Sequence, residues 1–138
     1  MFNIRCSVFA IALTATVAGC GGSDRQLYHV SGTVSFNGQP VPAGSIFFEP
    51  DVAAGNDGTQ GFSEIKNGRF DTSDSEKGIT GGAYQVRIRG FTPPAGGEPA
   101  KVLFKDYRQS IQLPTANSQQ TITVPPEAAA GAELPEPT

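Results

Sequence analysis

The strongest constraint on the fold is a run of alternating apolar and polar residues that stops at an Asn-Gly pair. In the segment 29–36, polar residues alternate with apolar ones at Val30, Val34 and Phe36. A period of two indicates a strand with one buried and one solvated face. Asn37-Gly38 follows directly and favours a tight hairpin turn, because both residues tolerate positive φ. We therefore expect the folded part of the chain to begin as an antiparallel sheet.

The same pattern predicts further strands along the chain. They lie at 45–49, at 62–66, at a short segment carrying Phe70 beyond a second Asn-Gly pair, at 84–89 and at 121–124. The segment 51–61 reads as a surface loop, and Phe104–Arg108 reads as a single helical turn. The 17 glycines and 11 prolines favour strands and turns over long helices. Six or seven strands in about 100 residues are typical of a β-sandwich.

Two local patterns predict structural roles. Tyr84 follows Gly81-Gly82 in the cleanest alternating segment, and we expect a tyrosine corner, with the ring in the core and the hydroxyl bonded to nearby backbone. Pro40 and Pro42 flank Val41 and stiffen the bend into the next strand, which indicates an edge or a corner.

The first twenty residues predict export. Arg5 precedes an apolar run at 8–17, and Gly19 and Cys20 follow. This layout is typical of a signal peptide of residues 1–19, cleaved between Gly19 and Cys20, with Cys20 carrying a lipid. A transmembrane helix needs about 20 apolar residues, roughly twice this run. A plain secreted protein with a free Cys20 thiol is the other alternative.

This leader resembles that of bacterial lipoproteins, which implies acylation of Cys20 and stable membrane anchoring through several acyl chains. Residue 21 is Gly rather than Asp, and by the same resemblance this favours the outer membrane. Cys6 leaves with the leader, so no disulfide framework is expected. Residues 20–27 are predicted to be a flexible tether, and residues 126–138 a disordered acidic tail rich in Pro, Ala and Glu.

Four segments between these ends carry a second resemblance: 32–48, 67–70, 81–88 and Phe104–Tyr107. Their order resembles carboxypeptidase regulatory-like domains, and more closely the small bacterial lipoproteins that carry this domain alone. The resemblance implies a single transthyretin-like or Ig-like β-sandwich over 28–125, with about seven antiparallel strands. In metallocarboxypeptidases this domain accompanies a separate catalytic domain, so no activity is implied here.

A search for reactive groups favours a protein that is not an enzyme. His29, the single histidine, would lie about 7 Å from Ser31 on the same strand face, too far for a nucleophile–base pair. One histidine without a free cysteine does not make a zinc site. Two acidic loops offer oxygen ligands for calcium, but we favour solvated turn residues and predict no metal or cofactor; these residues are Asp51, Asn56 and Asp57, and Asp71, Asp74 and Glu76.

Binding is the remaining class of function. No run of basic residues is present among ten Lys and Arg, so nucleic acid is not an expected partner. Phe47, Phe62, Phe91 and Tyr107 are aromatic residues expected near the surface, and Phe91 leads into a loop with Pro93 and Pro94. These four residues (Phe91, Pro93, Pro94 and Tyr107) are our candidate contact surface; the alternative is that the rings pack beneath the loops. We expect a membrane-anchored protein-interaction or structural module whose partner is an envelope protein, or alternatively a carbohydrate-binding module of the envelope.

Overall fold

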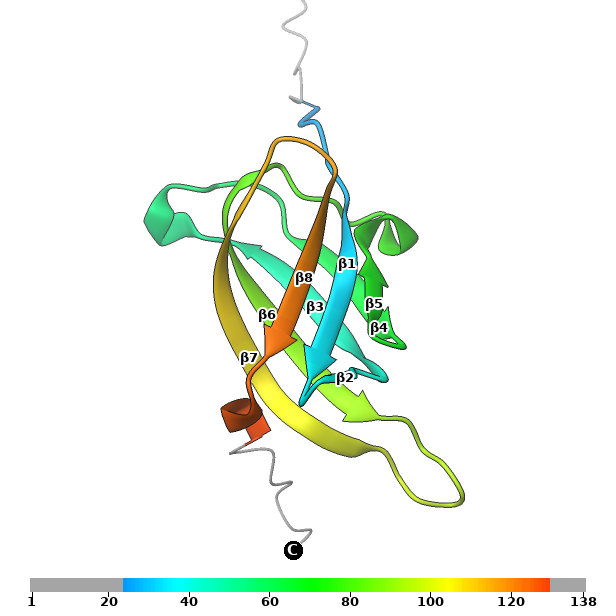
Figure 1. The fold of residues 1–138 in the computed structure, drawn as a ribbon. Coiled ribbons are helices and arrows are strands. Elements are labelled where there is room, and N and C mark those ends of the chain that lie inside the picture. Colours follow the sequence, from blue (N-terminus) through cyan, green and yellow to red (C-terminus); the bar gives the residue numbers. More distant parts are fainter. Residues whose placement is uncertain (1–23, 130–138) are drawn as a thin grey trace, which may run out of the picture.

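The computed structural model describes residues 24–129, which form strands joined by turns and three short 3-10 turns (Figure 1). The strands are β1 (Val30–Phe36), β2 (Gln39–Pro40), β3 (Ala43–Pro50), β4 (Gly61–Lys66), β5 (Arg69–Asp71), β6 (Gly82–Thr92), β7 (Lys101–Leu113) and β8 (Ser118–Val124). The 3-10 turns are η1 (Val52–Ala54), η2 (Thr72–Ser75) and η3 (Pro126–Ala129). The fold is all-β, as the sequence predicted.

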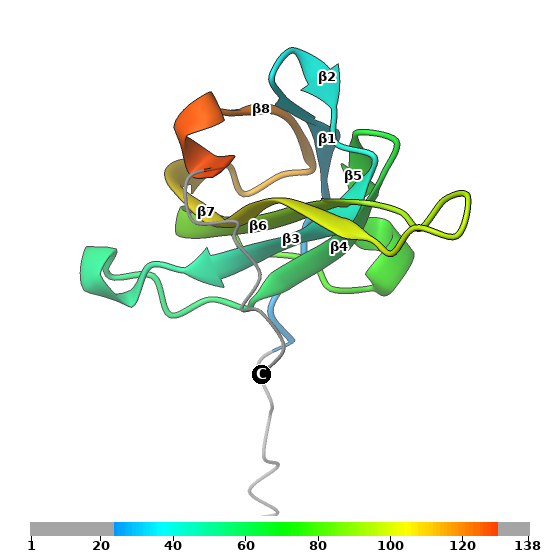
Figure 2. The ribbon, with the colours of Figure 1, turned by 90° about the horizontal axis from the view of Figure 1, so that it is seen from below.

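The strands form one strongly curled sheet, which folds back on itself as a sandwich does. Its order is β2-β1-β5-β4-β3-β6-β7, and β8 pairs with β1. In Figure 2 the layer of β4, β3, β6 and β7 lies beneath β1 and β8. Every pair is antiparallel except β1–β8, which is parallel over seven residues. The prediction of antiparallel strands is therefore wrong for this pair, because the chain crosses from β7 over the end of the molecule before it descends beside β1.

The core lies between the two layers and follows the predicted alternation. Val30, Val34 and Phe36 of β1 face Ile46 and Phe48 of β3 across the interior, and all five are buried. The remaining buried apolar residues are Val41, Ile65, Phe70, Ile79, Tyr84, Val86, Ile88, Phe104, Leu113, Ile122 and Val124. Burial of apolar surface is the main favourable term for such a domain.

Both Asn-Gly pairs form the predicted hairpin turns. Asn37 and Gly38 have φ values of 51° and 71°, and Asn67 and Gly68 have φ values of 50° and 73°. Positive φ at both central residues is the type I′ turn, whose twist matches the twist of the paired strands. Val41, between its two prolines, is fully buried beside the second turn and accepts a hydrogen bond from the Gly68 amide, so the expected corner is confirmed.

The predicted helical turn at Phe104–Arg108 is wrong, because these residues lie within β7. Phe104 is paired with Gly90 and Tyr107 with Ile88, so one extra residue of β7 bulges out between them. Asp106, in the bulge, has a φ of 42°. The extra residue places Phe104 and Tyr107 three positions apart on the same side, a spacing that mimics a helical turn in the sequence.

The two ends of the domain are more ordered than predicted. Within the expected tether, Arg25 donates to the carbonyl of Asp57 at 2.8 Å. Tyr28, directly after the tether, forms a two-bond bridge with Ile79. At the other end, residues 126–129 of the expected disordered tail form η3, and Ala128 packs against the core.

Candidate functional site

An open groove lies where β5 separates from β4. The two strands pair only at Lys66 and Arg69 and then diverge. Serine side chains replace the missing ladder bonds: Ser63 Oγ accepts from the Asp71 amide at 3.0 Å, and Ser75 Oγ donates to the carbonyl of Phe62. The Asp71 amide and the Phe62 carbonyl therefore have hydrogen-bond partners although the two strands have separated. The separation leaves a hollow on the surface instead of a continuous sheet.

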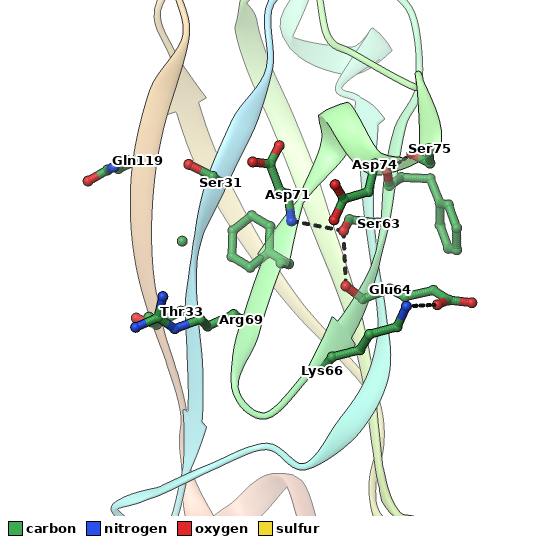
Figure 3. Close-up of a pocket in the computed structure, with 13 residues that line it drawn as sticks. Ser31, Thr33, Ser63, Glu64, Lys66, Arg69, Asp71, Asp74, Ser75 and Gln119 are labelled. Atoms are coloured by element: carbon green, nitrogen blue, oxygen red, sulfur yellow. Dashed lines mark hydrogen bonds and ion pairs between the residues drawn. The ribbon is translucent and has the colours of Figure 1, made fainter.

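The groove has a volume of about 790 Å³ and a wall of mixed polar and apolar character (Figure 3). Three strands and η2 contribute to it, together with one residue of β8. Its lining residues are Ser31, Gly32, Thr33, Phe62, Ser63, Glu64, Lys66, Arg69, Phe70, Asp71, Asp74, Ser75 and Gln119. Hydroxyl, amide and charged groups of this kind offer both donors and acceptors to a polar ligand.

The charges in the groove are divided between its two ends. Asp71 and Asp74 lie toward η2, whereas Lys66 and Arg69 lie toward the Asn67-Gly68 turn (Figure 3). Lys66 pairs with Glu64 at 3.1 Å. The Ser73 hydroxyl and amide donate to the Asp71 carboxylate, and these bonds hold the pKa of Asp71 below its ordinary value. Asp71 is therefore ionised at neutral pH, and the η2 end of the groove is negative.

The structure brings together only part of the predicted contact surface. Phe91, 37% exposed, lies near the end of β6, and Pro93 and Pro94 are exposed in the loop that follows. Tyr107 is opposite Ile88, packs against the core and lies on the other face of the sheet from Phe91. Phe91, Pro93 and Pro94 share one end of the molecule, and Tyr107 does not belong to that surface.

The other two predicted surface aromatics belong to a structural cluster on the outer face of the sheet. The rings of Phe47 and Phe62 lie 4.9 Å apart, and the Arg87 guanidinium lies 4.4 Å from the Phe47 centroid. Arg87 also pairs with Glu49 at 2.8 Å, and Arg108 reaches the same carboxylate at 3.4 Å. This row of cross-strand contacts fixes the register of β4, β3, β6 and β7.

Several of the residues considered as calcium ligands bind other groups of the domain. The Asp51 carboxylate accepts from the Ala54 amide and caps η1, and the Asp71 carboxylate caps η2. The Asn56 amide donates to the carbonyl of Ala83 at 2.6 Å. Among residues 24–129, no three His, Cys, Asp or Glu side chains are grouped in a way that could hold a metal ion.

His29 has a structural environment at the start of β1. Its backbone amide donates to Asn117 Oδ1 at 2.9 Å, and its carbonyl accepts from the Ser118 amide. Its Nδ1 lies 3.4 Å from Thr72 Oγ1. Thr72 Oγ1 in turn accepts from the Val30 amide, so these residues join β1 to β8 and η2.

The groove is the feature that the sequence did not indicate. Ser63 and Ser75 bridge β4 to β5 and η2, yet each is a single serine in a polar context. The one available signal is the brevity of β5: three residues before Thr72 cannot complete a ladder against the six residues of β4.

No protein-family model and no curated protein matches this chain. The leader, with Gly19 and Cys20, lies outside the described residues. In the part of the chain that the structure describes, we find no helix with the length and apolar character needed to cross a membrane.

Proposed function

We propose that this protein is a lipid-anchored, non-enzymatic module of the bacterial cell envelope that presents a contact surface to a partner protein. The supporting observation is the position of the two ends of the domain. Residues 24–29 leave the molecule at one end, and the loop between β6 and β7 lies at the other (Figure 1). Anchoring through Cys20 would therefore direct that loop away from the membrane.

The distal loop has the character of a contact surface. It carries Pro93 and Pro94, both exposed, and it follows Phe91, one of three exposed large apolar residues in the described chain. Proline lowers the conformational entropy that a loop loses on binding, and aromatic residues are enriched at interface centres. An isolated bridge between Ala95 and Glu98 closes the loop tip and further restricts it.

A photo-crosslinking residue at Pro94 tests this proposal in intact cells. We expect a covalent adduct with an envelope protein when the crosslinker replaces Pro94. The matched control is Thr115, which is exposed in the loop between β7 and β8 at the opposite end. Adducts of equal yield at both positions, or none at Pro94, would contradict the proposal.

Carbohydrate binding is a second candidate, and the groove beside β5 is what favours it. The groove, of about 790 Å³, combines serine, threonine and carboxylate groups with the rings of Phe62 and Phe70. The polar groups offer donors and acceptors to sugar hydroxyls. Calorimetry of the domain with cell-wall glycan fragments tests it. Binding that is lost in Asp74→Asn and retained with the Pro94 variant would favour a glycan over a protein partner.

A further inference from the structure

The turn η1 holds the most exposed large apolar side chain of the described chain. Val52 is 76% exposed, and Ala53 and Ala54 beside it are exposed as well. The turn is rigidly held: the Asp51 carboxylate accepts from the Ala54 amide at 3.2 Å, and the Gly55 amide donates to the carbonyl of Val52 at 3.0 Å. Single exposed apolar residues are common, so exposure alone does not indicate a function. The position of η1 in the molecule is what indicates a role for this tip, Val52–Ala54.

The tip belongs to the loop that holds the N-terminal segment. Arg25 donates to the carbonyl of Asp57 at 2.8 Å and pairs with its carboxylate at 3.4 Å. Cys20 precedes Arg25 by five positions, and a fully extended chain of that length spans at most about 18 Å. A lipid on Cys20 therefore keeps Arg25, and Asp57 beside it in the loop 51–60, within about 18 Å of the bilayer surface.

We propose that η1 rests on the membrane, with Val52, Ala53 and Ala54 in the interfacial layer of the bilayer. This inference rests on the proposed lipid anchor. Leu27, 39% exposed, follows Arg25 by two positions on the segment between the anchor and β1, and Arg25 binds the same loop. Together with the acyl chains, the tip gives the domain a second point of attachment and a fixed orientation.

The contact does not need high intrinsic affinity. Three small apolar residues bury too little surface to hold a soluble protein on a membrane, but a short tether keeps their effective concentration at the surface high. The tip therefore sets orientation, and the lipid supplies the affinity.

The charges near the tip favour a zwitterionic surface. The Asp51 carboxylate is bonded within the domain, where Gln85 Nε2 donates to it at 3.2 Å, and Asp57 is paired with Arg25. Asp24 adds a further exposed negative charge at this end. Anionic headgroups would repel these carboxylates, so phosphatidylcholine vesicles are the appropriate probe.

The test places an environment-sensitive fluorophore on Val52→Cys in the full lipidated protein bound to phosphatidylcholine vesicles. After acylation of Cys20 and loss of Cys6, the introduced cysteine is the single free thiol of the mature chain. We expect the emission of the fluorophore to shift to the blue on the vesicles. We also expect its intensity to fall when the vesicles contain a lipid with a quencher near the headgroup. The matched control is Pro94→Cys, at the other end of the domain, which should show neither.

Equal quenching at both positions, or no quenching at residue 52 while the protein floats with the vesicles, would overturn the membrane contact and leave the anchor intact. Failure of the full protein to float would overturn both proposals. A second experiment guards against an effect of the label itself, with the fluorophore placed on Ala53→Cys. Adding Val52→Asp, at an exposed position, should retain the fold and remove the quenching of that fluorophore.

Discussion

The hydroxyl of Tyr84 joins the loop that carries Thr59 to the segment that leads into β6. It donates to the carbonyl of Thr59 at 2.9 Å and accepts from the Thr80 amide at 3.1 Å, while the ring is fully buried. The predicted tyrosine corner is confirmed, because the ring occupies the core and the hydroxyl binds backbone four residues upstream.

Two substitutions of Tyr84 separate these contributions. Tyr84→Phe keeps the ring and should lower the free energy of unfolding by about 1–3 kcal/mol, because the half-buried Thr80 amide and Thr59 carbonyl lose their partner. Tyr84→Ala also removes the ring and should cost about 3–5 kcal/mol. Chemical denaturation of the domain measures both; equal losses in the two variants would show that the ring contributes nothing.

Acid should weaken the contact between β6 and the bulge of β7. Arg89 donates to Asp106 at 2.6 Å, and this bond, with the charge of Arg89, holds the pKa of Asp106 below its ordinary value of 3.8. A carboxylate with a depressed pKa in the folded state stabilises the fold above its unfolded pKa and loses that effect as pH falls through the folded pKa. The contribution is therefore complete at neutral pH, and it declines as the pH falls from about 4 through the lower pKa of the folded state.

The variant Asp106→Asn tests this dependence. Asparagine accepts the positive φ at this position, so the fold is retained while the titrating group is removed. Between pH 5 and about pH 2, the melting temperature of Asp106→Asn should fall less steeply than that of the parent. Parallel melting curves against pH would contradict the role assigned to Asp106.

At the scale of elements, the parallel pair β1–β8 depends on one glycine. A Cβ built on Gly32 would lie 1.8 Å from the carbonyl oxygen of Gln120, inside the neighbouring strand. Because the obstacle is backbone, the contact cannot be relieved by a side-chain rotation.

Gly32→Ala should therefore push β8 away from β1 and lower the free energy of unfolding by at least about 2 kcal/mol. Hydrogen exchange measured by mass spectrometry should show lost protection in residues 118–124 first. Gly38→Ala is a matched control, because a Cβ at that turn meets no atom within 4 Å and costs only the strain of its positive φ. Equal loss of protection at β8 in both variants would contradict the packing argument.

Local features of the fold follow from the sequence, and features made by distant segments do not. The two Asn-Gly hairpins need only their own residues, and both were predicted. The parallel pairing of β1 with β8, in which Val30 lies beside Ser118, could not be predicted. The alternation of apolar and polar residues in these strands is equally compatible with antiparallel pairing. The bulge before Tyr107 interrupts the alternation of inward and outward residues in β7, so the strand is hard to recognise in the sequence. The groove beside β5 arises where two strands separate, and this leaves no periodic pattern in the sequence.

At the scale of the whole molecule, the proposed anchor has a direct chemical test. Cells labelled with a radioactive or clickable fatty acid should incorporate the label into the parent protein. Cys20→Ser should abolish incorporation, because the thiol is the site of acyl attachment that the leader predicts. A labelled Cys20→Ser protein would contradict the anchor, and Pro94→Ala controls for expression and export.

The pairing of the first strand with the last has a consequence for biogenesis. Val30 needs Ser118 as its neighbour, and these residues are 88 positions apart. A chain delivered N-terminus first across a membrane would present β1 long before β8 emerges, so the core could not close until nearly the entire chain had passed. High contact order slows folding, and here the domain would reach its folded state only after β8 has crossed.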